Sequence, residues 1–100
     1  MTREENLLLT AMEESAEVQQ AISKAMRFGL ERYNPDSPFE NNAESIMIEY
    51  YQLCAMIEML QHKCVLPYFN DEKINKIMSD KIEKVERYQN VSESLGLISD

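Results

Sequence analysis

The positions of glycine and proline decide how this chain of 100 residues can fold, because it contains only two glycines and three prolines. Both residue types disfavour helix interiors, since proline lacks the N–H donor and glycine loses the most backbone entropy. Neither interrupts the sequence from Leu7 to Phe28, and Gly29 follows directly. The segment Thr2-Arg3-Glu4-Glu5 has the pattern of a capping box. We therefore predict a first helix from about Glu4 to Phe28, with Gly29 as its C-cap.

A polar segment separates this helix from the next one. Residues 30–40 contain two prolines, so we predict a loop there, and no residue run in the chain demands a strand. Asn41 and Asn42 follow, and an asparagine at an N-cap accepts a hydrogen bond from a free backbone N–H. A second long helix is therefore predicted to begin after them and to end near His62.

A third helix is predicted beyond Pro67, where Asn70 offers a cap. The apolar residues that follow recur three and four positions apart, as on one face of a helix. They are Ile74, Ile77, Met78, Ile82 and Val85. We expect a single all-α domain over residues 1–100, with two long antiparallel helices and a third, over about 71–90, packed against them.

Charge and hydropathy exclude two classes of partner. The formal net charge of -8 argues against binding a nucleic acid polymer, which needs a basic surface. No apolar run approaches the roughly 20 residues that cross a membrane, and the acidic start MTREEN is unlike a signal peptide. We expect a cytoplasmic protein. A chain this short buries a small core, so a homodimer or homotetramer is also expected.

The two cysteines are expected to be reduced. If Cys54 and Cys64 share one helix, about 15 Å separates them, which is too far for a disulfide. We expect both to be thiols in the core. A zinc site is not expected, because His62 is the only histidine and the cysteines are not paired in sequence.

Four oxygen-bearing side chains are expected to converge where the first two helices pack. Glu14 and Glu17 lie three residues apart, at the edge of an apolar helix face. In the second helix, Glu49 points into the apolar stripe and Gln52 follows three residues later. Clustered carboxylates raise one another's proton affinity and oppose folding unless a cation neutralises them. The pattern therefore favours Mg²⁺ or Mn²⁺, which prefer oxygen ligands.

Two simpler interpretations stay open for these glutamates. Helical glutamates are usually solvated surface residues, and that is the ordinary expectation for any one of them. Glu49, which points inward, is open instead to a local salt bridge with Lys24 or Arg27. Neither interpretation needs a metal ion.

The acidic residues also match two halves of a known motif. Glu13-Glu14-x-x-Glu17, followed after a loop by Glu49-x-x-Gln52, resembles the EExxE…ExxD pattern of the MazG-like all-α nucleoside triphosphate pyrophosphohydrolases. The resemblance covers about Leu7 to Leu60, and residues 21–29 with Asn41-Asn42 resemble segments of small, phage-type members. It implies a MazG-like bundle completed by oligomerisation, and the host cytoplasm as the location of a phage-encoded member.

The resemblance implies roles for individual residues. Glu14, Glu17 and Glu49 would be catalytic Mg²⁺ ligands, with Gln52 as a further metal-site residue. The metal would bridge the phosphates and orient a water, so that a nucleoside triphosphate yields pyrophosphate and the monophosphate. The expected substrate-binding residues are Lys24 and Arg27 for phosphates, and Tyr33, Asn41 and Asn42 for the base or sugar. For the two asparagines, a helix cap is the favoured alternative.

Gln52 departs from the family pattern, which has Asp at this position. An amide oxygen can coordinate Mg²⁺ but brings no charge, which puts hydrolysis in doubt without removing nucleotide binding. Glu13 would be the replacement carboxylate. Three functions stay open: a Mg²⁺-dependent pyrophosphohydrolase, a non-hydrolysing protein that holds a nucleotide or cyclic-nucleotide signal as a phage sponge would, and a helical interaction module without a small ligand.

Overall fold

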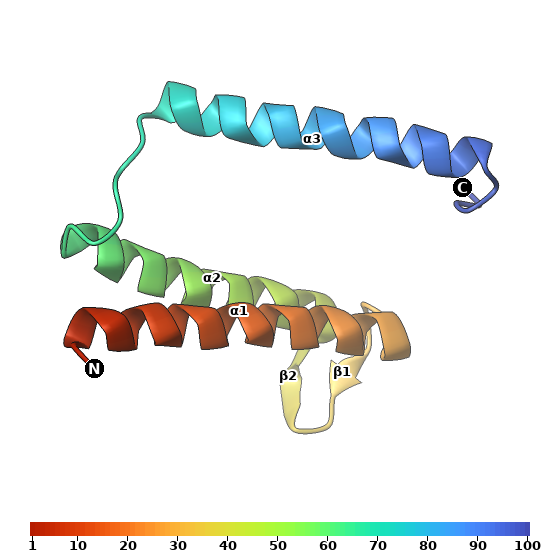
Figure 1. Ribbon diagram of the computed structural model, residues 1–100. Helices are drawn as coiled ribbons and strands as arrows, with labels where there is room; N and C mark the ends of the chain where they lie inside the picture. Colours follow the sequence, from red (N-terminus) through yellow and green to blue (C-terminus); the bar gives the residue numbers. More distant parts are fainter. The chain divides into compact units, whose positions relative to one another are not determined.

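Three α-helices make up most of the chain: α1 (Arg3–Phe28), α2 (Asn42–His62) and α3 (Asp71–Ser94) (Figure 1). This computed structural model describes the backbone of residues 1–100 and the side chains of all of them except Asn34 and Ser37. The all-α prediction is confirmed. The chain divides into two compact units, Met1–Pro67 and Tyr68–Asp100. The packing of the third helix against the first two stays a prediction.

Local capping fixes both ends of α1 where the sequence predicts them. The Thr2 hydroxyl accepts a hydrogen bond from the Glu5 N–H (3.1 Å), and the Glu5 carboxylate accepts one from the Thr2 N–H (3.4 Å). This reciprocal pair is the expected capping box. At the other end, Gly29 has a φ of 97°, a conformation that glycine adopts readily, and its N–H donates to the Ala25 carbonyl.

A short β-hairpin joins α1 to α2, and here the prediction of a loop without strands was wrong. Strand β1 (Tyr33–Asn34) pairs antiparallel with β2 (Ser37–Asn41), with Tyr33 opposite Asn41. The segment reads as a loop because it carries two prolines, yet proline is tolerated in edge strands, and both strands of a two-stranded sheet are edges. Strand pairing depends on a partner that no local pattern names.

Two adjacent asparagines, Asn41 and Asn42, lie at the start of α2, and their side chains make different hydrogen bonds. Asn41 is the N-cap, as predicted: its side-chain oxygen accepts from the Glu44 N–H at 2.8 Å. Asn42 is the first helical residue and is 95% buried, since only 5% of its surface is exposed. Its side-chain amide donates to the Gly29 carbonyl at 2.9 Å, which ties the start of α2 to the end of α1.

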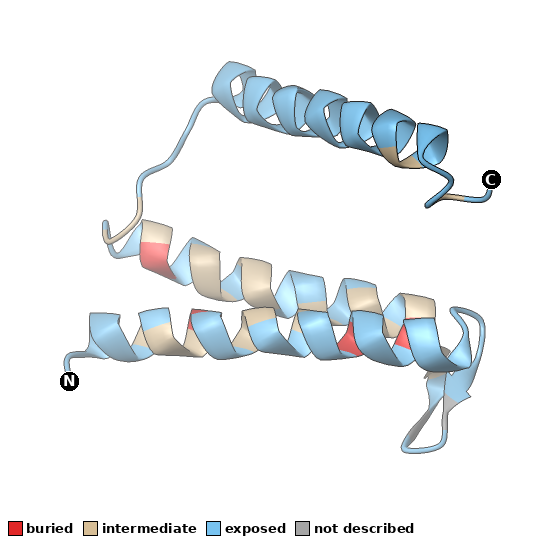
Figure 2. Cartoon of the chain, turned by 45° about the vertical axis from the view of Figure 1, so that its right-hand side comes forward, coloured by how far each residue is buried: buried red, intermediate tan, exposed pale blue. Residues whose placement is uncertain are grey.

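Helices α1 and α2 lie antiparallel, and their contact forms a small core (Figure 2). The buried residues are Ala11, Ala21, Ala25, Asn42 and Leu60. Leu60 is the only described large side chain that is fully buried. Alanines on α1 let the two helix backbones approach closely, but they bury little apolar surface. Much of the apolar surface of this unit is therefore left exposed.

Beyond α2, the chain turns through a Schellman motif centred on Cys64. The Val65 N–H donates to the Leu60 carbonyl (2.9 Å), and the Cys64 N–H donates to the Gln61 carbonyl (3.0 Å). Cys64 has a φ of 61°, in the left-handed region that glycine usually fills. Both cysteines are free, as expected, but the expected core position was wrong for Cys64, which is exposed because α2 ends before it.

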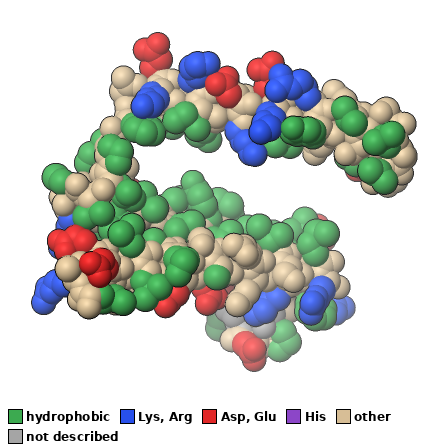
Figure 3. All heavy atoms as spheres, viewed as in Figure 1, with side chains coloured by type: hydrophobic (Ala, Val, Ile, Leu, Met, Phe, Trp, Pro, Cys, Tyr) green, Lys and Arg blue, Asp and Glu red, His purple; other side chains and the backbone are tan. Residues whose placement is uncertain are grey.

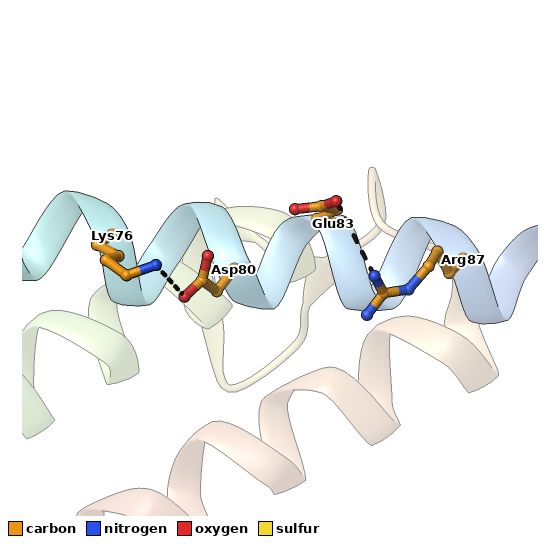
Figure 4. Close-up of polar contacts among 4 residues, drawn as sticks. All are labelled: Lys76, Asp80, Glu83 and Arg87. Carbon is orange, nitrogen blue, oxygen red and sulfur yellow. Dashed lines mark hydrogen bonds and ion pairs between the residues drawn. The ribbon is translucent and has the colours of Figure 1, made fainter.

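Helix α3 begins with the predicted cap, since the Asn70 side chain accepts from the Lys73 N–H at 2.8 Å. None of the described residues of α3 is buried, and hydrophobic side chains run along one side of it (Figure 3). Two exposed ion pairs, Lys76–Asp80 and Glu83–Arg87, link successive turns (Figure 4). Such surface pairs add little stability. No helix in the described part of the chain has the length and hydropathy to cross a membrane.

Candidate functional site

An acidic hollow lies between α1 and α2 beside the hairpin, with a volume of about 100 Å³. We use the name acidic hollow for this surface throughout. It is lined by Glu17, Gln20, Ala21, Lys24, Glu40, Asn42, Ser45 and Glu49. Three of these residues are glutamates and one is a lysine, so the lining carries more negative than positive charge.

Helical periodicity explains why these side chains share one surface. The α1 residues stand at positions 17, 20, 21 and 24, and the α2 residues at 42, 45 and 49. Spacings of three, four and seven place side chains on one helix face. The antiparallel pairing turns these two faces toward each other. Glu40 comes from β2, directly before the N-cap of α2.

Glu49 has an unfavourable electrostatic environment, and its pKa is raised above the ordinary value of 4.5. Partial burial is the largest cause, because water solvates the charged carboxylate better. The negative charges of Glu17, Glu14 and Glu40 follow in that order, and the positive charge of Lys24 opposes them. The acidic hollow thus holds more negative charge than its own residues neutralise.

The structure brings together some of the residues that the sequence singled out. Glu17, Lys24, Asn42 and Glu49 line the acidic hollow. Glu14 does not line it, although it is half-buried and close enough to act on the pKa of Glu49. Glu17 and Glu49 therefore share one surface, and Glu14 lies near it.

Other predicted residues lie elsewhere. Gln52 is exposed and does not line the acidic hollow, so the expected convergence of four oxygen-bearing side chains is not met there. Gln52 stands three positions after Glu49 and turns toward solvent. Arg27 is also exposed and outside this surface. Asn41 acts as the helix cap, which was the favoured alternative to substrate binding.

The expected alternative for Glu49, a salt bridge to Lys24 or Arg27, is not formed among the described side chains. Among the described side chains, no ion pair within 4.0 Å joins Glu49 to Lys24 or Arg27. Lys24 acts on Glu49 only as the weakest of five influences on its pKa. Glu49 is therefore left partly buried without a close cation.

Sequence reasoning missed three polar residues of the acidic hollow: Gln20, Glu40 and Ser45. Helical spacing could have found Gln20, three positions after Glu17, and Ser45, four before Glu49. No such signal exists for Glu40. It reaches the site because the unpredicted hairpin carries it there.

A second and larger hollow, of about 510 Å³, lies beside the hairpin. We call it the aromatic hollow. It is lined by Lys24, Phe28, Arg32, Tyr33, Pro35, Asp36 and Asn42. The predicted substrate residue Tyr33 lies here, and Lys24 and Asn42 belong to both hollows. The two hollows therefore adjoin at these two residues.

The N-terminus of α2 adjoins both hollows, but its backbone N–H groups are already used. The Asn42 N–H donates to the Arg32 carbonyl and the Ala43 N–H to the Leu30 carbonyl, each at 2.9 Å. The Glu44 N–H donates to the Asn41 side chain. An anion in the hollows must therefore be met by side chains such as Lys24 rather than by the free N–H groups of a helix start.

The donor atoms suit Mg²⁺, although they do not form a complete protein site. In the part of the chain that the structure describes, no group of three or more His, Cys, Asp or Glu residues is arranged to hold a metal ion. Mg²⁺ is commonly bound by one or two carboxylates together with waters and substrate phosphates. Glu17 and Glu49 offer such carboxylates in one hollow. Glu17 and Glu49 are the residues of the acidic hollow that would hold such an ion.

No protein-family model matches the chain, and no curated protein or solved structure matches it significantly. The resemblance to the MazG-like motif therefore stays an expectation from the motif residues alone.

Proposed function

We propose that this protein binds a Mg²⁺-nucleoside triphosphate at the acidic hollow and acts as a MazG-like nucleotide pyrophosphohydrolase. The observation that carries the proposal is that Glu17, Glu40 and Glu49 line one hollow between α1 and α2, together with a single lysine, Lys24. Burial and the neighbouring glutamates raise the pKa of the Glu49 carboxyl, which is consistent with crowded negative charge. Such a cluster opposes folding unless a cation joins it. The motif Glu13-Glu14-x-x-Glu17 and Glu49 supplies most of these glutamates.

The roles follow from the positions of the side chains. Glu17 and Glu49, with Glu14 nearby, would hold the Mg²⁺ ion, which would supply neutralisation of phosphate charge and activation of water. Lys24 would contact a phosphate oxygen as a point charge. Gln20 and Ser45 add neutral hydrogen-bonding groups to the same surface.

A second candidate is a protein that binds a nucleotide or a cyclic-nucleotide signal without cleaving it. Two observations favour it. Gln52 replaces the family's Asp and lies outside the acidic hollow, and no three-residue metal group exists among the described side chains. A site with fewer carboxylates than the family motif would bind the phosphates of a nucleotide without catalysing their hydrolysis.

Assembly and location belong to the same proposal. Large apolar side chains exposed on α1 and α2 favour a homodimer or homotetramer, because exposed apolar patches usually mark interfaces. They include Met12, Ile22, Met26, Met47 and Tyr51. Two free cysteines are typical of a reducing compartment, which favours the cytoplasm.

A product assay tests the enzyme. The purified protein with Mg²⁺ and a panel of canonical and modified nucleoside triphosphates should form monophosphate and pyrophosphate in excess of protein. Glu49→Gln should lower the rate by about 100-fold or more. Glu58→Gln, an exposed glutamate on the same helix, should leave it unchanged. Stoichiometric retention of nucleotide without product would instead support the binding protein.

A further inference from the structure

We propose that the aromatic hollow is the nucleoside subsite, in which the base packs against Phe28 and Tyr33 while the phosphates extend into the acidic hollow. The inference rests on the proposed function, because it assigns the rest of the same ligand. Lys24 and Asn42 line both hollows and mark the point where nucleoside and phosphates would join.

The sizes of the two hollows support this division. Pockets for small organic ligands typically measure roughly 300–1,000 Å³. The aromatic hollow, at about 510 Å³, falls within this range, whereas the acidic hollow, at about 100 Å³, is too small for a whole nucleotide. The aromatic hollow thus has room for the nucleoside, which the acidic hollow cannot hold.

The lining of the aromatic hollow combines two aromatic rings with polar and charged groups, as pockets for small organic ligands commonly do. Phe28 and Tyr33 are 57% and 56% exposed, although aromatic rings gain most from being covered. Any of the nucleobases can stack on such a ring, because every base has a π-face. Arg32 adds a guanidinium, which can stack on a base or donate to its acceptor atoms.

Strand pairing and hydrogen bonds fix the backbone around the aromatic hollow. Tyr33 lies in β1, opposite Asn41 in β2. The neighbouring Arg32 carbonyl accepts a hydrogen bond from the Asn42 N–H at the start of α2. Phe28 is the last residue of α1 and directly precedes Gly29. The Gly29 carbonyl accepts a hydrogen bond from the Asn42 side chain. Backbone positions that are already fixed reduce the conformational entropy that is lost when a base binds.

Binding measurements on the full-length protein test the inference. Isothermal titration calorimetry would compare ATP, GTP, CTP and UTP with inorganic tripolyphosphate, all with Mg²⁺. Tyr33→Ala and Phe28→Ala should weaken binding of the preferred nucleotide about tenfold or more, and change tripolyphosphate affinity less than about twofold. Tyr33→Phe, which keeps the ring, should bind like the wild type.

Phe39→Ala is the matched control, because Phe39 belongs to the same hairpin, is 96% exposed and does not line the aromatic hollow. It should leave both affinities unchanged. Melting curves identify any variant that fails to fold, and Tyr33→Leu then replaces Tyr33→Ala as the ring deletion.

The outcomes separate the two proposals. Equal losses for nucleotide and tripolyphosphate, or no loss in either ring variant, would overturn the nucleoside subsite. A wild-type protein that binds tripolyphosphate as tightly as every nucleotide would overturn it as well, while leaving phosphate binding at the acidic hollow in place. A wild-type protein that binds neither probe would overturn the proposed function and the subsite together.

Discussion

The side-chain amide of Asn42 donates a hydrogen bond of 2.9 Å to the backbone carbonyl oxygen of Gly29. This bond connects the first residue of α2 to the C-cap of α1 across 13 positions in the sequence. The backbone N–H of the same asparagine donates to Arg32. One residue therefore fixes the helix ends and the hairpin that surround both hollows.

Loss of this bond should destabilise the protein. In Asn42→Ala the Gly29 carbonyl loses its shorter hydrogen bond and keeps only the one from the Arg32 N–H at 3.4 Å. The free energy of unfolding should therefore fall by about 0.5–1.5 kcal/mol. Urea denaturation followed by circular dichroism measures the change. Gln52→Ala, at an exposed position of the same helix, serves as the control. Equal stability of Asn42→Ala and the wild type would show that the bond contributes nothing.

The pH dependence of stability should carry the signature of Glu49. As pH rises from the ordinary value of 4.5, the unfolded chain loses the Glu49 proton before the folded chain does, because the folded-state pKa is raised. The contribution of Glu49 to the free energy of unfolding is therefore fully present below pH 4.5. It is lost as the pH rises through the pKa of Glu49 in the folded protein. Glu49→Gln, which cannot ionise, should melt at a higher temperature than the wild type at pH 7.

This advantage of Glu49→Gln should disappear near pH 4, where the wild-type carboxyl is largely protonated in the folded protein. Thermal melts across this pH range measure it. Glu58→Gln is the matched control, since Glu58 is exposed on the same helix. A Glu49→Gln protein that is no more stable than the wild type at neutral pH would contradict the assignment.

The neighbours of Glu49 should shift its pKa in a fixed order. Glu17→Gln should lower that pKa more than Glu40→Gln, because the charge of Glu17 has the larger effect. Lys24→Met should raise it, because the only opposing positive charge is removed. NMR titration of labelled glutamate carboxyls reads each shift directly. An unchanged pKa in Glu17→Gln would mean that these side chains do not share the acidic hollow.

Cys64→Gly should stabilise the protein by about 1 kcal/mol. Cys64 holds a φ of 61°, which glycine adopts without the steric penalty of a side chain. Gly96, with a φ of 76°, fills the equivalent position after α3. Cys64→Ala is the control, because it removes the thiol but keeps a β-carbon. If both variants melt alike, the thiol rather than the backbone is responsible.

Mg²⁺ and nucleotide should raise the melting temperature together rather than Mg²⁺ alone, because the described residues offer no complete metal site. A ligand that binds only the folded state at 100 times its Kd stabilises by about 2.7 kcal/mol. Thermal shift assays with Mg²⁺, nucleotide and both would measure this. A melting temperature that no combination changes would favour the interaction module without a small ligand.

The helices are largely predictable because their boundaries are local. Thr2 and Glu5 form a capping box within one turn, and Asn41 and Asn70 cap their helices through residues three positions on. Gly29 ends α1 through its own backbone conformation. Each of these signals lies within a few residues of the boundary that it sets, so the sequence alone determines it.

The sites depend on contacts between distant residues, and only the tertiary structure decides them. Helical spacing indicated that Glu17 lies at the edge of an apolar face and that Glu49 points inward. It did not indicate that Glu40 joins them, because the hairpin that carries Glu40 forms by pairing with a separate segment. Asn42 looked like a second cap, and became a buried donor because Gly29 lies beside it in space. Local patterns fix which face a side chain takes, whereas packing fixes which neighbours it meets.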